Sequence, residues 1–119
     1  MKKILVVEDN EANLYLIRFI LEKSGYEVIE AREGVVGVEL AVKEKPDLIL
    51  MDVQLPDIDG LEATKRIRAS EADGDIPIIA LTSFAMAGDR EKALAGGCTG
   101  YIEKPINPET FMAEIEKYL

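Results

Sequence analysis

The sequence contains no histidine and a single cysteine, and these two shortages limit the metal sites and cross-links that the chain could form. Without histidine, the usual ligand sets for zinc are not available. A single cysteine, Cys98, excludes a disulfide within the chain, which fits a reducing compartment. We therefore expect a cytoplasmic protein whose chemistry relies on other side chains.

Long apolar runs and clusters of basic residues are also missing. No run approaches the length of about 20 apolar residues that spans a bilayer, and the N-terminus has no signal-peptide pattern. The formal net charge is −9, and no Lys/Arg cluster is present to replace counterions along a nucleic-acid backbone. We expect binding neither to nucleic acid nor to a membrane, but to cations or protein partners.

The 119 residues, 48% of them hydrophobic, suffice for one domain spanning 1–119, and no linker marks a second. Apolar, strand-forming segments alternate along the chain with helix-forming segments. The predicted strands are 3–7, 26–30, 48–51, 76–81 and 99–103. The predicted helices are 11–24, 35–45, 60–69, 86–95 and 107–118.

Strict alternation of strands and helices predicts an α/β fold with a parallel sheet covered on both faces, since each right-handed crossover lays its helix on one face. We expect a three-layer α/β/α, (βα)5 arrangement of the flavodoxin-like class, with five parallel strands in the order 2-1-3-4-5. In that order strand 26–30 lies on one side of strand 3–7 and strand 48–51 lies on the other. The direction in which successive strands are added to the sheet therefore reverses between strands 3–7 and 48–51. Ligands of such sheets bind at this position, beyond the carboxyl ends of the strands.

Three acids follow these two strands: Glu8 and Asp9 after the first, and Asp52 after the second. Taken alone, each is more readily explained as a turn residue. Together in one crevice they would raise one another's pKa, and a divalent cation would relieve the repulsion. Hard carboxylate oxygens suit Mg²⁺ or Mn²⁺.

Two further groups end the fourth and fifth strands, namely the hydroxyl of Thr82 and the ammonium of Lys104, which precedes Pro105. With a cation they would supply donors and positive charge for the equatorial oxygens of a phosphoryl group, and Asp52 would supply the attacking oxygen. The sequence therefore predicts formation of an aspartyl phosphate at Asp52.

This combination of motifs resembles the receiver domain of two-component response regulators over essentially the whole chain. The matching pieces are Glu8-Asp9, Asp52 after Asp47-Leu48-Ile49-Leu50-Met51, Leu55-Pro56, Asp59-Gly60, Thr82 and Lys104-Pro105. The segments 82–89 and 96–106 are most similar to DivK-type single-domain regulators and to receiver modules of hybrid histidine kinases. One small departure is Glu8, where many members have aspartate.

The resemblance implies a role for each matching residue. Asp52 would be the phosphoacceptor, and Mg²⁺ would be bound by Asp9, Asp52 and the backbone carbonyl of Gln54, with Glu8 assisting through water. Thr82 and Lys104 would contact the phosphoryl oxygens, and the peptide bond between Lys104 and Pro105 would be cis.

The function expected from this resemblance is a phosphorylation switch rather than an enzyme acting on other substrates. The donor is a histidine kinase or histidine phosphotransfer protein, because a chain without histidine cannot supply the phosphohistidine itself. Phosphorylation would draw Thr82 inward and let Tyr101 turn toward strand 76–81. A target protein would then bind the surface of helix 86–95, strand 99–103 and helix 107–118. We expect a monomer, and dimerisation on phosphorylation stays open.

Three other functions fit the sequence less well. A haloacid-dehalogenase-type phosphatase also forms an aspartyl phosphate, but it needs an acid where this chain has Gln54. A flavodoxin would bind flavin phosphate after the first strand, where Glu8, Asp9 and Glu11 would repel it. A receiver-like module that is never phosphorylated would not need the complete set of site residues.

Two apolar features lie beside the predicted site. In helix 11–24 we expect Leu14, Tyr15 and Phe19 to face solvent, either to dock a helical phosphodonor or to be covered by helix 107–118. Phe84, two residues after Thr82, is expected to exclude water from phosphorylated Asp52, with packing against Met86 as the alternative.

Overall fold

The structure, a computed structural model, describes residues 2–70, 76–83 and 88–119. Strands and helices alternate throughout these residues, as the sequence predicts. The elements are β1 (Lys3–Val7), α1 (Glu11–Lys23), β2 (Glu27–Ala31), α2 (Gly34–Glu44), β3 (Leu48–Asp52), α3 (Gly60–Ser70), β4 (Ile78–Thr82), α4 (Asp89–Ala95), β5 (Gly100–Glu103) and α5 (Phe111–Glu116).

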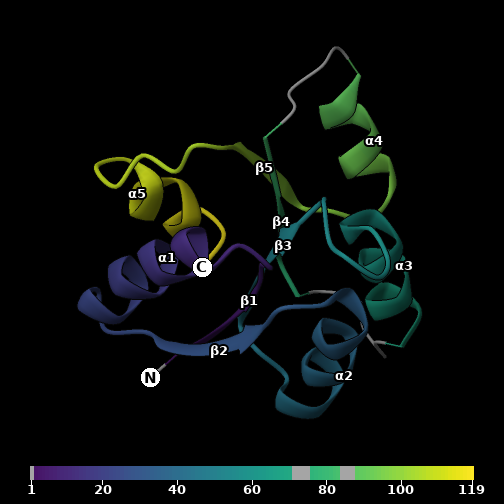
Figure 1. The fold of residues 1–119 in the computed structure, drawn as a ribbon, viewed down its shortest axis with the longest axis horizontal. Helices are drawn as coiled ribbons and strands as arrows, with labels where there is room; N and C mark the ends of the chain where they lie inside the picture. Colours follow the sequence, from purple (N-terminus) through teal and green to yellow (C-terminus); the bar gives the residue numbers. More distant parts are fainter. Residues whose placement is uncertain (1, 71–75, 84–87) are drawn as a thin grey trace.

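The five strands form one parallel sheet in the order β2-β1-β3-β4-β5 (Figure 1). This is the predicted flavodoxin-like α/β fold, so the prediction of fold class and strand order is confirmed. Within the described ranges, no helix combines the length and the apolar character that crossing a bilayer requires.

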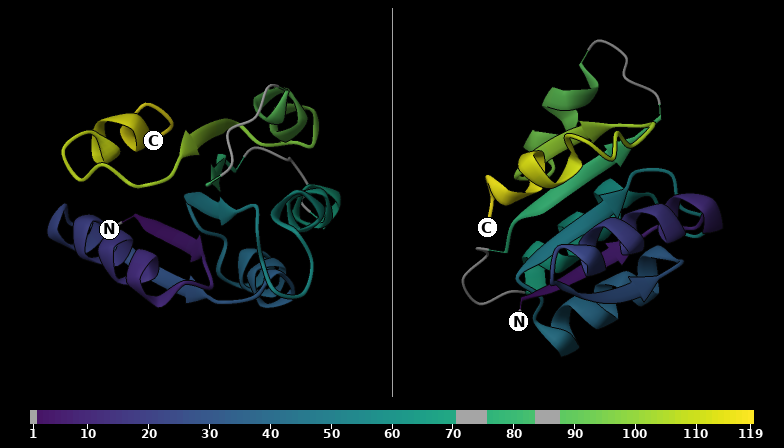
Figure 2. Two further views of the ribbon diagram at one scale, coloured as in Figure 1. Left: turned by 45° about the horizontal axis from the view of Figure 1, so that its top comes forward. Right: turned by 90° about the vertical axis from the view of Figure 1, so that its left-hand side faces the viewer.

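Alternating side chains of the strands divide the core into two apolar layers. Ile4 and Val6 of β1 pack in the layer that α1 and α5 cover. Leu5 and Val7 pack in the opposite layer, with side chains of α2, α3 and α4. Figure 2 shows these two helical layers on either side of the sheet. Because both faces of the inner strands are buried, their sequences are continuous apolar runs.

The register of the sheet brings the carboxyl ends of the strands to one edge. Val7 lies opposite Met51, Asp52 opposite Leu81, and Thr82 opposite Glu103. The residues that follow β1, β3 and β5 therefore leave the sheet at neighbouring positions.

The predicted helix 107–118 is shorter in the structure, where α5 spans Phe111–Glu116. The side chain of Asn107 accepts a hydrogen bond from the Glu109 N–H at 3.0 Å, and its carbonyl accepts one from the Phe111 N–H at 2.9 Å. These bonds hold the residues after Asn107 in a turn before the α-helix begins. The predicted start of helix 86–95 lies outside the described residues, and α4 begins at Asp89 in the described chain.

The prediction that Leu14 faces solvent is wrong. Leu14 is 2% exposed and packs in the core layer that contains Ile106, Phe111 and Ile115. Leu14, Ile17 and Leu21 are spaced three and four residues apart, so they share the buried face of α1. Tyr15 and Phe19, by contrast, are 68% and 53% exposed, as expected.

Gly60, the first residue of α3, packs directly against the backbone that follows β3. A Cβ atom at this position would lie 2.1 Å from the carbonyl oxygen of Asp52 and 2.8 Å from its carbonyl carbon. The Gly60 N–H also donates to the Val53 carbonyl at 2.8 Å, which fixes this close approach. Position 60 therefore has no room for any side chain.

We predict that Gly60→Ala lowers the free energy of unfolding by about 3 kcal/mol, because the new methyl group must displace the backbone of Asp52 and Val53. Gly25→Ala is the matched control: Gly25 has a φ of +91°, but a Cβ atom added there would meet no atom within 4 Å. That variant should lose about 1 kcal/mol from backbone strain alone. Urea unfolding measures both, and equal losses would contradict the close packing at Gly60.

Candidate functional site

Glu8 and Asp9 directly follow β1 and differ in burial. The Glu8 N–H donates to the Ala31 carbonyl at 2.9 Å and so continues the pairing of β1 with β2. The Glu8 side chain consequently turns inward and is fully buried, whereas Asp9 is exposed. Asn10 then caps α1 by accepting a hydrogen bond from the Asn13 N–H at 3.0 Å.

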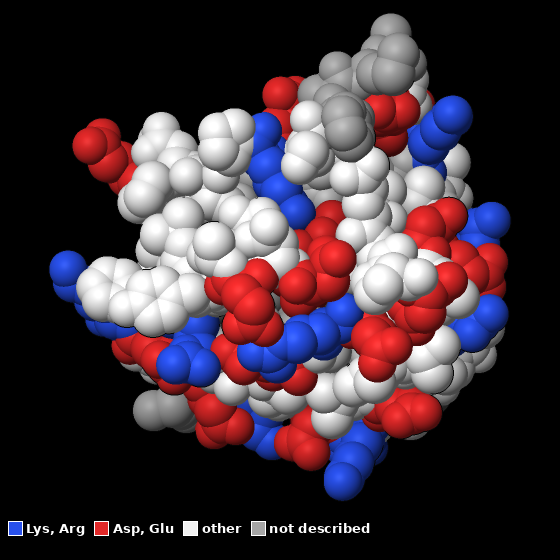
Figure 3. All heavy atoms as spheres, viewed as in Figure 1, with Lys and Arg blue, Asp and Glu red and all other residues white. Residues whose placement is uncertain are grey.

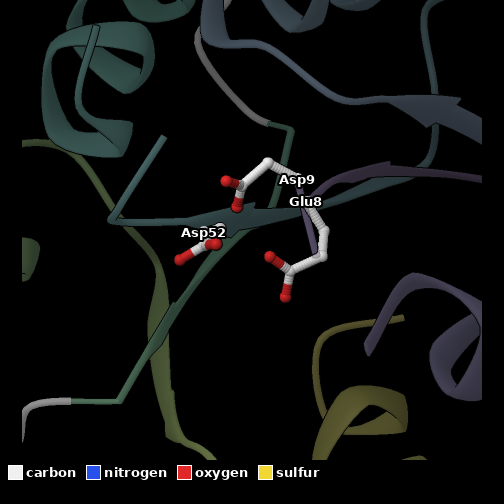
Figure 4. Close-up of side chains that lie close together, drawn as sticks. All are labelled: Glu8, Asp9 and Asp52. Carbon is white, nitrogen blue, oxygen red and sulfur yellow. The ribbon is translucent and has the colours of Figure 1, made fainter. Parts of the chain in front are cut away.

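Asp52 is the last residue of β3 and is 3% exposed. Its Oδ1 accepts a hydrogen bond from the Gln54 N–H at 3.0 Å, which orients the carboxylate at the strand end. Carboxylate oxygens of Glu8, Asp9 and Asp52 lie within 4.8 Å of one another. Figure 4 shows the three carboxyl groups converging from the ends of β1 and β3 on one space.

Lys104 reaches this cluster from the end of β5, the strand at one edge of the sheet. Its backbone N–H donates to the Thr82 carbonyl at 2.7 Å, directly after β5, and the following peptide bond to Pro105 is cis. The Lys104 Nζ lies 2.7 Å from Glu8 Oε1 and 3.1 Å from Asp52 Oδ2. One ammonium group thus forms ion pairs with two buried carboxylates.

These groups line a polar cavity of about 500 Å³ that opens to solvent. Its lining residues are Glu8, Asp9, Asn10, Glu11, Asn13, Asp52, Gln54, Ser83 and Lys104. Acidic side chains crowd the middle of the face drawn in Figure 3, with basic side chains among them. Small anions would be repelled here unless a cation or the Lys104 ammonium offsets the carboxylates.

Thr82 and Tyr101 border a second cavity beside the first. Thr82, the last residue of β4, is 5% exposed. It shares with Tyr101 and Gln54 the lining of a cavity of about 190 Å³, which side chains of α3 and α4 complete. Burial raises the pKa of Tyr101, and nearby acids, Asp89 first, raise it further.

Burial and ion pairing have opposite effects on the pKa values of Glu8 and Lys104. Burial, and then the contact with Asp52, raises the pKa of Glu8 to about 7, and the ammonium of Lys104 offsets this only in part. Burial by itself would lower the pKa of Lys104, but its contacts with Glu8 and Asp52 outweigh burial, so the pKa is raised. Lys104 therefore stays protonated at neutral pH.

The donor atoms of the site suit a hard divalent cation. Three carboxylates face one ammonium, so an excess of negative charge remains when all are ionised. In addition, Oε1 of Glu8 is buried and finds no partner of hydrogen-bond geometry among the described residues, although the Lys104 ammonium is near. Oxygen donors and surplus charge of this kind fit Mg²⁺.

Comparison with known proteins decides which family this site belongs to. The family described as "Response regulator receiver domain" matches residues 4–116. The chain belongs to this family. It is 49% identical over 118 residues to the polar-differentiation response regulator DivK of Brucella ovis, covering 99% of this chain and 96% of that protein.

Solved structures of other receiver domains superpose on nearly the whole chain. One is the receiver domain of the sensor histidine kinase PA1611 from Pseudomonas aeruginosa PAO1, with a TM-score of 0.90, 39% identity and coverage of 98% of this chain and 96% of that one. That structure holds a magnesium ion coordinated in its active-site cleft. The chemotaxis response regulator CheY4 of Vibrio cholerae has a TM-score of 0.94 at 32% identity, covering 100% of this receiver and 99% of that chain.

The sequence predicted most of the residues that meet at the site of this receiver domain, although Thr82 lines the neighbouring cavity, and it missed two contacts. Glu8, Asp9, Asp52, Gln54 and Lys104 line one cavity. The direct pairing of Glu8 with Lys104 was not predicted. Asp57 was not singled out at all, and its two hydrogen bonds to α2 have no signature in the sequence. Phe84 and Met86 lie outside the described residues.

We predict a pH-dependent gain in stability for Glu8→Gln. The folded receiver binds the Glu8 proton more tightly than the unfolded chain does, since the pKa rises from 4.5 to about 7. The contribution of Glu8 is therefore fully present below pH 4.5 and is lost as the pH rises through 7. Relative to wild type, Glu8→Gln should gain about 2 kcal/mol in unfolding free energy between pH 5 and pH 8.

Urea unfolding with a chelator present measures this difference. Glu11→Gln is the control, because the contact with Arg32 lowers the pKa of the exposed Glu11. Its carboxylate is thus ionised throughout this pH range, and the difference from wild type should stay constant. A pH-independent difference for Glu8→Gln as well would show that Glu8 titrates normally.

Proposed function

We propose that this receiver domain, acting as one unit over residues 1–119, is a phosphorylation switch that accepts a phosphoryl group on Asp52. The supporting observation is that Asp52 Oδ2 lies 3.1 Å from the Lys104 Nζ inside a polar cavity open to solvent. A carboxylate oxygen of Asp52 attacks the phosphorus of a partner's phosphohistidine. The bond between phosphorus and the imidazole nitrogen breaks, and its electron pair leaves with that nitrogen.

Magnesium, or manganese, is the cofactor that we propose for this reaction. Asp9, Asp52 and the backbone carbonyl of Gln54 would hold the ion, with Glu8 close behind them and able to act through water. The bound ion supplies positive charge that offsets the negative charge of the transferred phosphoryl group. Support comes from the converging carboxylates and from the magnesium ion in the PA1611 receiver domain.

Lys104 and Thr82 are proposed to contact the phosphoryl oxygens. The Lys104 ammonium is already held beside Asp52, so it needs little rearrangement to stabilise new negative charge there. We propose that the domain catalyses its own phosphorylation and dephosphorylation and has no other substrate. A haloacid-dehalogenase-like phosphatase is a weaker alternative, because the amide of Gln54 cannot serve as the general acid that such an enzyme needs.

The output of the switch is proposed to be the surface of α4, β5 and α5. The cavity shared by Thr82 and Tyr101 gives Tyr101 space to turn inward when Thr82 moves toward a phosphoryl group. A third cavity, of about 290 Å³ and lined by Arg90, Glu103 and Glu114 as well as Tyr101, lies on this surface. A change at Tyr101 would therefore alter the shape that a downstream target protein meets.

The partners proposed are a histidine kinase or histidine phosphotransfer protein as donor, and a separate protein target. The donor must bring its phosphohistidine to the polar cavity, which α1 borders through Glu11 and Asn13. Tyr15 and Phe19 lie exposed on α1, one helical turn apart. We propose that a helix of the donor docks on these two rings. A monomer is proposed, with dimerisation on phosphorylation left to experiment.

We expect a small phosphodonor together with Mg²⁺ to add one phosphoryl group to the wild-type protein. Asp52→Asn should abolish the addition, because an amide oxygen is a poor nucleophile. Asp47→Asn, which removes the same charge at an exposed position, should be phosphorylated like wild type. Intact-mass analysis measures the addition. An unchanged addition on Asp52→Asn would disprove the assignment of the phosphoacceptor.

If the donor protein docks on α1, substitutions there should slow phosphotransfer from a histidine protein but not from a small phosphodonor. Tyr15→Asp and Phe19→Asp should each slow transfer from a phosphorylated histidine protein about tenfold, because each loses apolar contact area and adds charge at the centre of the interface. Reaction with the small phosphodonor should not change, since neither residue lines the cavity. Val42→Asp, on the exposed face of α2, is the control for a surface charge. Equal transfer rates for all three variants and wild type would exclude docking on α1.

A further inference from the structure

Asp57 connects the loop after Asp52 to the start of α2. Its Oδ1 accepts a hydrogen bond from the Gly34 N–H at 2.7 Å, and its Oδ2 accepts one from the Val35 N–H at 2.9 Å. Gly34 and Val35 are the first two residues of α2, whose own N-cap residue, Glu33, makes no side-chain capping bond. The helix is thus capped by a residue 23 positions away in the sequence.

The contact between this loop and α2 is tight as well as polar. A Cβ atom on Gly34 would lie 2.5 Å from Cγ1 of Ile58 and 3.2 Å from its carbonyl oxygen. The backbone hydrogen bonds, that from Val35 foremost, hold the pKa of Asp57 at about 2. Asp57 therefore keeps its charge toward the partly positive end of α2 at any neutral or mildly acidic pH.

Further contacts hold the loop near its two ends, and the Gln54 N–H itself donates to Asp52 Oδ1 at 3.0 Å. At the start, the Val53 N–H donates to the Leu81 carbonyl of β4 at 2.9 Å. At the end, Gly60 donates to Val53, and Asp59 caps α3 by accepting from the Glu62 N–H at 2.8 Å. Gln54 is exposed and lies between these anchors, three residues before Asp57.

We infer that Asp57 is a positioning residue for the divalent cation, because its two bonds to α2 hold the loop that presents the backbone carbonyl of Gln54. This inference rests on the proposed function, in which that carbonyl is a ligand. Without the Asp57 carboxylate, the middle of the loop loses its two hydrogen bonds to α2 and keeps only the packing of Ile58 against Gly34. The Gln54 carbonyl then has to be ordered when the cation binds, which lowers affinity.

The test compares Asp57→Ala with Asp59→Ala in binding of Mg²⁺ by isothermal titration calorimetry. Both variants remove one helix-capping carboxylate from the same loop, so both should lose stability. Asp57→Ala should raise the dissociation constant of Mg²⁺ about tenfold, a typical effect for a group that orients a metal ligand. Asp59→Ala should change it less than twofold, because the bond from Gly60 to Val53 still holds that end of the loop.

Two further measurements distinguish positioning from loss of structure. Amide hydrogen exchange of Gly34 and Val35 should speed up in Asp57→Ala, which reports loss of the cap. Phosphorylation by the small donor should slow about tenfold at limiting Mg²⁺ and recover at saturating Mg²⁺, which a misfolded site would not do. Asp57→Asn, which keeps one acceptor oxygen, should lie between wild type and Asp57→Ala and serves if the alanine variant does not fold.

The outcomes separate this inference from the proposed function. Equal Mg²⁺ affinity of Asp57→Ala and wild type, or an equal loss in Asp59→Ala, would overturn the role of Asp57 alone. Failure of the wild-type protein to bind Mg²⁺ and to accept a phosphoryl group would overturn the proposed function and this inference with it.

Discussion

The ion pairs of the Lys104 ammonium with Glu8 and Asp52 are the interaction on which the site depends. Two carboxylates with almost no exposure to water, those of Glu8 and Asp52, lie beside a third, that of Asp9. One ammonium cannot neutralise three acids, and burial, followed by the contact with Asp52, keeps the pKa of Glu8 raised despite the Lys104 ammonium. An imbalance of this kind, rather than any single residue, would favour binding of a cation at the site.

The fold can tolerate this imbalance because the charges lie at the edge of the sheet and not within it. The strand residues below Asp52 are apolar and form two separate layers with the helices. Burial of those layers stabilises the domain independently of the site. Carboxylates can therefore be held at the strand ends in an arrangement that costs stability but serves binding, as is common at functional sites.

The sequence predicted the fold because the central strands are continuous apolar runs. Such runs indicate strands that are buried on both faces, as in a parallel sheet covered by helices. It predicted the cavity because acids and Lys104 directly follow strands whose order was inferred correctly. Leu14 was misplaced because nearly every residue around it in α1 is apolar, so the phase of the helix was ambiguous. The pairing of Glu8 with Lys104 depends on the reach of a side chain across the sheet, and pattern alone does not contain that distance.

The position of Lys104 suggests how phosphorylation of Asp52 could change the conformation of a surface away from the site. Lys104 follows β5 at one edge of the sheet, yet its ammonium contacts residues that follow β1 and end β3, with β4 lying between β3 and β5. Its backbone is bound to Thr82, and Tyr101 lies three residues earlier on β5. A new negative charge on Asp52 would compete with Glu8 for the ammonium and pull on a segment that is hydrogen-bonded to β4. Because Lys104 directly follows β5, and β5 is paired with β4 residue by residue, that pull would act on the strand that carries Tyr101.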